Sequence, residues 1–226
     1  MKRVSFLALL LLFLPGLGGA AKPSGEAARL ERTLRGVASL RAEFVQIRDV
    51  ALTGESIQAR GVLAFRPPDR FRLAYVTPEP QELVIRGDSL WVIMPSENQA
   101  QRYPYEDGAP GSEVFLLFGG KGRTLDDVFT VEEGAWGSYP KAIRLVPKNV
   151  EPGYPIEEIR LVVGGNGLPQ RLFLREATGD NVVFTFTRMD RNVANIESLV
   201  KLRIPKGMEV IETTPTRGTG DLPIDR

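Results

Sequence analysis

The sequence predicts a mainly β protein with a few helices (α+β), in which short antiparallel strands form one curved sheet. Three observations predict it. Apolar and polar side chains alternate with a period of two over most of the chain after residue 40, Gly and Pro interrupt these runs at hairpin spacing, and helical spacing is confined to short stretches. Such strands build a sandwich or a barrel. A single sheet of about ten strands tends to curl, which makes one face concave.

Three segments have the pattern of a helix. Residues 24–38 carry apolar side chains at helical spacing, with Ser24 as a possible cap of the first turn. Residues 112–118 lie between a serine and a pair of glycines, and Leu125–Val128 is a shorter candidate. These helices are expected to lie across the concave face. Periodicity alone leaves open whether that face is a filled core or a cavity.

The strands are expected where the period is two. The runs in question are 40–45, 61–65, 70–75, 83–85, 90–94, 142–146, 158–163, 171–175, 182–187 and 200–204. Gly-rich connections at 164–167 and 178–181 indicate hairpins. Residues 21–212 are expected to form one domain, and the Thr-, Pro- and Gly-rich residues 213–226 a flexible tail.

The first twenty residues resemble a cleavable signal peptide. Lys2 and Arg3 precede an apolar run, Val4–Leu14, and small residues follow it at 18–21. The run is too short to span a bilayer of about 30 Å, although a membrane anchor remains the alternative. We therefore expect 1–20 to be removed and the mature protein to be exported.

The composition argues against the common catalytic and metal sites. The chain has no His and no Cys, which removes the imidazole base, the thiolate nucleophile and their metal sites. A net charge of +1 gives no reason to expect a nucleic-acid partner. The adjacent acids at 126–127 and 132–133 are expected to be solvated. We expect no enzyme activity, no catalytic residues, no metal and no cofactor.

From Ser39 to Gln46 the chain resembles the outer-membrane lipoprotein carrier family of the LolA type, whose opening S-L-x-A-x-F-x-Q is matched. The resemblance extends over about residues 24–211. Further positions at family-like spacing are Gly61, Pro68, Phe71, Arg72, Tyr75, Pro78, Gln81, Gly87, Leu90, Trp91, Pro95 and Gln99, followed by the closing segment 202–211.

The resemblance implies a fold and a function. The fold is an unclosed, strongly curved antiparallel half-barrel of about 9–11 strands, with helices covering a concave cavity. The implied function is that of a monomeric periplasmic carrier for acylated lipoproteins, loaded by an inner-membrane ABC transporter and unloaded to an outer-membrane acceptor. The alternative is a periplasmic lipid- or lipoprotein-sensing regulatory or interaction domain on the same fold.

Strand periodicity and the resemblance together select the residues expected to bind acyl chains. They are Phe44, Leu63, Phe65, Phe71, Leu73, Tyr75, Leu83 and Ile85 on the sheet, and Val114, Phe115, Leu117 and Phe118 in the second helix. Arg66 is the candidate contact to the helical lid. The family's arginine in this segment falls on Pro67, so Arg66 starts on the other side of the strand. We therefore expect apolar contact to hold the lid.

Overall fold

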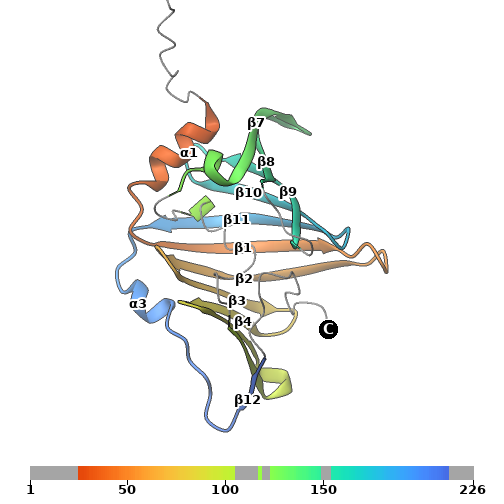
Figure 1. Ribbon diagram of the computed structural model, residues 1–226, viewed down its shortest axis with the longest axis vertical. Helices are drawn as coiled ribbons and strands as arrows, with labels where there is room; N and C mark the ends of the chain where they lie inside the picture. The colour runs from red at the N-terminus through yellow and green to blue at the C-terminus, as the bar shows by residue number, and fades with distance from the viewer. Residues whose placement is uncertain (1–24, 105–116, 119–122, 149–153, 214–226) are drawn as a thin grey trace, which may run out of the picture.

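The computed structural model describes residues 25–104, 117–118, 123–148 and 154–213. They form one curved sheet with short helices around it (Figure 1). The helices are α1 (Glu26–Leu34), η1 (a 3-10 turn, Pro95–Glu97), α2 (Leu125–Val128) and α3 (Ile196–Leu199). The strands are β1 (Leu40–Asp49), β2 (Ser56–Arg66), β3 (Arg70–Thr77), β4 (Gln81–Arg86), β5 (Ser89–Met94), β6 (Gln99–Pro104), β7 (Phe129–Trp136), β8 (Tyr139–Pro147), β9 (Ile156–Val163), β10 (Pro169–Glu176), β11 (Asn181–Arg191) and β12 (Glu209–Glu212).

The sheet has the order β12-β6-β5-β4-β3-β2-β1-β11-β10-β9-β8-β7, so its two edges, β12 and β7, do not pair with each other. This is the unclosed, strongly curved β half-barrel that the resemblance implied, and its described residues form twelve strands where about 9–11 were expected. The long strands β1, β2 and β11 lie in its middle (Figure 1). Consecutive strands pair in antiparallel orientation from β1 to β6 and from β7 to β11. The strand β1 pairs with β11, which joins these two groups into one sheet.

The last part of the chain corrects two predictions. The strand expected at 200–204 is absent: this segment runs outside any ladder, and Leu202 and Ile204 pack on the outer face against Val84 and Ile93. The chain joins the sheet only at β12, which pairs with β6 in parallel rather than antiparallel orientation. A segment that packs one side on a sheet alternates apolar and polar residues as a strand does, so period two could not distinguish them.

The first helix is shorter than expected. Helix α1 ends at Leu34, because Gly36 follows within one turn, and α2 occupies the predicted 125–128. The predicted second helix lies outside the described residues except for Leu117 and Phe118, which are buried in the core. Within the described parts of the chain, no helix is long and apolar enough to span a membrane. The proposed signal peptide, 1–20, and nearly all of the tail fall outside the described residues.

Candidate functional site

The concave face carries an apolar block across β1 to β5. The strand register aligns side chains on neighbouring strands, and paired residues share a face. One row consists of Leu40, Phe65, Phe71, Ile85 and Leu90, and the next row consists of Ala42, Leu63, Leu73, Leu83 and Val92. The two rows form a continuous apolar surface on one side of the sheet.

The structure places all the predicted sheet residues on this concave face. Phe44, Leu63, Phe65, Phe71 and Leu73 are buried in the main apolar core. Tyr75, Leu83 and Ile85 are half-buried and pack against it. Leu117 and Phe118 are buried in the same cluster, and the Phe118 ring meets Phe186 edge-on at 5.8 Å. Val114 and Phe115 lie outside the described residues.

Phe44 marks the end of the apolar block. Its ring crosses β2 at Gly61, where an added Cβ would lie 2.6 Å from the Phe44 ring and 2.2 Å from the carbonyl oxygen of Ala74. Only glycine allows this close approach. The ring then meets Tyr75 edge-on, with centroids 5.5 Å apart. The Tyr75 hydroxyl donates a 2.6 Å hydrogen bond to Oε1 of Gln46, and burial raises the pKa of the Tyr75 phenol.

Charge is nearly absent from the part of this face that β1 to β6 form. Strands β1 to β6, all of whose residues are described, present one charged side chain on the concave side, Arg48. Arg48 pairs with Glu176 at 2.9 Å and with Asp180 at 2.8 Å. A hydrogen bond from the backbone N–H of Ala51, together with Arg48, lowers the pKa of the Asp180 carboxyl. This part of the face therefore offers apolar surface and neutral groups, which suits burial of an apolar ligand.

Helix α1 packs over the β7–β8 part of the concave side, with Leu30 and Leu34 buried in the core (Figure 1). Polar contacts also hold it, which the sequence did not predict. Oε2 and Oε1 of Glu133 accept 3.0 Å hydrogen bonds from the backbone N–H groups of Glu26 and Ala27. This carboxylate caps the first turn of α1 and neutralises the positive end of the helix. Ser24, the predicted cap, lies outside the described residues.

The lid helix also carries its own arginine anchor. Arg29 donates to the carbonyl oxygens of Gly164, at 2.5 Å, and Gly165, at 2.8 Å, in the β9–β10 hairpin. Apolar contact was expected to hold the lid without an arginine latch; Leu30 and Leu34 supply the apolar contact, but Arg29 adds such a latch, so this expectation is corrected. Sequence reasoning missed both anchors: Glu133 belongs to an acidic pair that was expected to be solvated, and Arg29 is an ordinary charged residue of a helix. Neither has a distinctive sequence pattern, because the contacts join residues more than a hundred positions apart.

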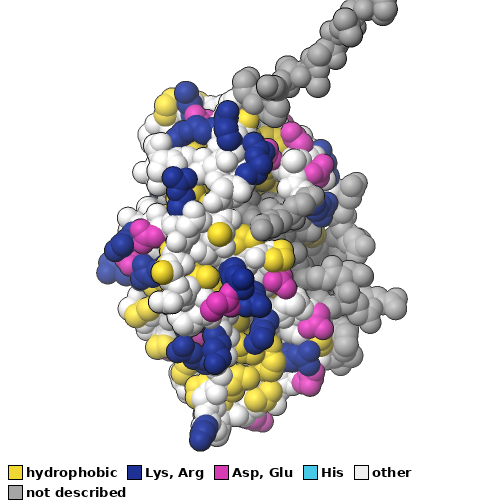
Figure 2. All heavy atoms as spheres, turned by 90° about the vertical axis from the view of Figure 1, so that its left-hand side faces the viewer, with side chains coloured by type: hydrophobic (Ala, Val, Ile, Leu, Met, Phe, Trp, Pro, Cys, Tyr) yellow, Lys and Arg dark blue, Asp and Glu magenta, His cyan; other side chains and the backbone are white. Residues whose placement is uncertain are grey.

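Arg66 lies on the opposite, outer face and makes no contact with α1. It forms an ion pair with Glu197 of α3, and Arg70 pairs with the same carboxylate. Helix α3 packs on Ala64, which neighbours Arg66 on this outer side of β2. The view in Figure 2 shows basic groups with acidic side chains next to several of them. Arg66 thus anchors an outer helix instead of the lid.

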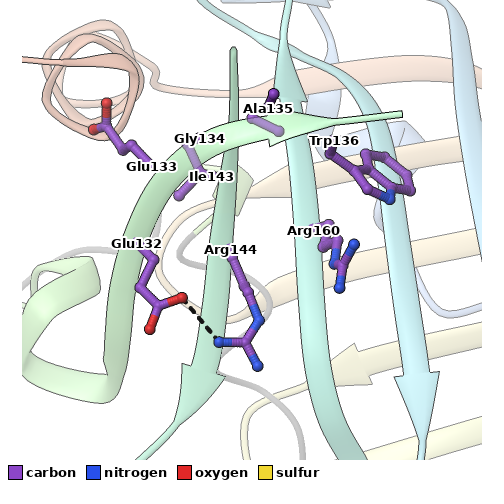
Figure 3. A pocket seen from close by; sticks show the side chains of 9 residues that line it. Glu132, Glu133, Gly134, Ala135, Trp136, Ile143, Arg144 and Arg160 are labelled. Carbon is purple, nitrogen blue, oxygen red and sulfur yellow. Dashed lines mark hydrogen bonds and ion pairs between the residues drawn. The ribbon is translucent and has the colours of Figure 1, made fainter. Parts of the chain in front are cut away.

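A small pocket of about 210 Å³ lies apart from the apolar block, between β7, β8 and β9 (Figure 3). Trp136, Arg144 and Arg160 line it, and the Arg144 guanidinium donates to Glu132 at 2.9 Å. Ligand pockets usually hold at least about 300 Å³ and are mostly apolar. The size and charge of this pocket do not suit a long acyl chain.

Comparison with known proteins gives one consistent family. The family model "Outer membrane lipoprotein carrier protein LolA" matches residues 35–201. An outer-membrane lipoprotein carrier protein of Cupriavidus pinatubonensis is 28% identical over 188 residues, which cover 81% of this chain and 86% of that protein. One of Alkalilimnicola ehrlichii is 28% identical over 192 residues, covering 85% and 86%.

The fold is also found among solved structures. An uncharacterized conserved protein from Thermus thermophilus superposes with a TM-score of 0.50 at 18% sequence identity, covering 83% of this chain and 97% of the other. At that identity the likeness concerns the fold alone.

Proposed function

Because the chain belongs to the family of outer membrane lipoprotein carrier proteins of the LolA type, we propose that it carries acylated lipoproteins through the periplasm, from the inner to the outer membrane. The apolar block is the observation that carries this proposal. It joins five strands of an unclosed sheet into one surface without a charged side chain. The one charged group on the concave side of β1 to β6, Arg48, lies outside this block and is paired with Glu176 and Asp180.

The energetics of the cargo support a carrier that encloses it. Each CH₂ exposed to water costs about 0.8 kcal/mol, so several long acyl chains in water cost tens of kcal/mol. Moving the chains from a membrane to a protein cavity is nearly neutral by comparison. We infer that an ABC transporter of the inner membrane loads the carrier, and that an acceptor with a slightly better apolar site unloads it. The carrier acts as a monomer, without cofactor, metal or chemical step.

The predicted binding residues of the sheet belong to one buried apolar cluster that also contains Leu30 and Leu34 of α1 and residues 117–118. We infer from this burial that the described structure is a closed form of the carrier. Acyl chains therefore have to displace this cover, and the cost of moving it is part of the loading work. The anchors at Glu133 and Arg29 hold α1 to β7 and the β9–β10 hairpin. Opening on this side needs these hydrogen bonds to break.

The proposal is tested by placing charge on the concave face. Phe71→Glu and Leu83→Glu should each lower capture of a purified triacylated lipoprotein at least about tenfold, because an unpaired charge in apolar surroundings costs several kcal/mol. Val76→Glu is the control, since this residue is 61% exposed and lies on the same strand as Phe71. Circular dichroism establishes that each variant is folded, and half-buried Leu83 is the milder site.

The results test the binding site and distinguish a carrier from a sensing domain. Normal capture by both folded variants would refute the concave face as the binding site. Capture by the parent protein without transfer to outer-membrane vesicles would reject the carrier and favour a sensing or interaction domain.

A further inference from the structure

Neutral polar side chains border the apolar block on two of its sides. Along one side, β6 continues the two apolar rows with Tyr103, opposite Leu90, and Gln101, opposite Val92. At the strand ends, Tyr75 pairs with Gln81. The members of this polar border are Gln46, Tyr75, Gln81, Gln99, Gln101 and Tyr103. All are carboxamides or phenols, and none carries a charge at neutral pH.

The border is already organised by hydrogen bonds between its members. Nε2 of Gln101 donates to Oε1 of Gln99 at 2.6 Å, and the Tyr103 hydroxyl donates to Oε1 of Gln101. Tyr75 and Gln46 form the corresponding pair at the other end. A carboxamide has two donor hydrogens and an oxygen with two lone pairs, so these bonds leave it able to bind a ligand as well. The side chains are half-buried, except Gln46, which is buried.

From this arrangement we propose that the polar border binds the ester and amide linkages at the head of the acylated cysteine, while the acyl chains lie on the apolar block. This inference rests on the proposed function and adds to it a selectivity of the carrier for the head of its lipid ligand. A triacylated cysteine carries two ester groups and one amide where its chains begin, and all three are neutral. Carboxamide and phenol groups match such carbonyl oxygens and N–H groups in both polarity and charge.

The same border disfavours phospholipids, which present chains of equal length. Their phosphate would have to leave water without a cation to receive it, and an ion buried unpaired is far more costly than a neutral group. The one cation on the concave side of β1 to β6, Arg48, is held by Glu176 and Asp180. The carrier would thus take lipoproteins from a membrane made mostly of phospholipid by rejecting the charged head.

The experiment compares three ligands with the purified protein by displacement of a fluorescent probe. They are a tripalmitoylated cysteine methyl ester, dipalmitoyl phosphatidylglycerol and hexadecane. The parent should prefer the first over the second. The variant Gln99→Leu/Gln101→Leu should bind the cysteine ester roughly 3- to 10-fold more weakly, as expected for one net hydrogen bond, and hexadecane at least as well as the parent. Gln58→Leu, on the exposed outer side of β2, is the matched control.

A second variant tests why the carrier disfavours phospholipids. Gln101→Arg supplies a cation to the border and should shift the preference toward phosphatidylglycerol by at least about tenfold. Parental selectivity in both border variants, with hexadecane still bound, would overturn the inference and leave the proposed function standing. Failure of the parent to bind any of the three ligands would instead refute the concave face as a lipid site.

Discussion

Replacing Glu133 by Ala should loosen the lid helix without disturbing the sheet. The carboxylate caps α1 with two hydrogen bonds of 3.0 Å to the N–H groups of Glu26 and Ala27. Loss of a helix cap costs about 0.5–2 kcal/mol, and loss of a negative charge at a helix N-terminus about 0.3–1 kcal/mol. Because the contacts are exposed to solvent, we expect about 1–2 kcal/mol in total, which is roughly a 5- to 30-fold increase in opening of α1.

Amide hydrogen exchange measures this opening residue by residue. In Glu133→Ala, the amides of α1 should exchange faster by that factor, while those of β1 and β11 keep parental rates. Loading with lipoprotein should also become faster, because a cover that opens more often admits cargo more often. Salt should diminish the difference between the two proteins, since the charge lies near the surface.

Glu132→Ala is the matched control. Glu132 is the preceding residue in β7, but alternation along a strand turns it to the other face, where it pairs with Arg144 at 2.9 Å. Its removal should leave exchange in α1 at the parental rate. Equal acceleration in both variants, or no acceleration in Glu133→Ala, would refute the capping argument.

Three further predictions concern the sheet and its outer helix. Gly61→Ala should lower the free energy of unfolding by about 1–3 kcal/mol in urea titrations, because its Cβ would lie 2.2 Å from a backbone oxygen; Gly134→Ala, with no atom within 4 Å of the added Cβ, should change it little. Asp180→Asn should destabilise the protein at neutral pH, where the carboxylate accepts the Ala51 N–H. Because the folded-state pKa of Asp180 is lowered, this stability is present above the ordinary aspartate pKa and is lost as the pH falls through the folded value. The difference between parent and variant should therefore shrink in acid, and a constant difference would contradict the assignment. Arg66→Ala should cost less than about 1 kcal/mol and leave lipoprotein release to acceptor membranes unchanged, since its ion pair is half-exposed and on the outer face; a severe release defect would show that Arg66 acts on the lid.

The period-two pattern determined which side chains share the concave face. From Leu63 through Tyr75 the alternation fixes a face for each residue, and the structure extends the same face across β4 to Leu83 and Ile85. The prediction succeeds because a strand has only two sides, so the local alternation is enough to assign each side chain to one of them. The motif from Ser39 to Gln46 supplied the family, and with it the unclosed sheet.

Tertiary structure decided everything that depends on which strand lies next to which. Glu132 and Glu133 are chemically identical neighbours, and only the position of α1 makes one a cap and leaves the other on the outer face. Likewise Gln101 borders the apolar block because β6 pairs with β5 in one register. Register and long-range contact arise from packing of the whole chain, and no short stretch of sequence encodes them.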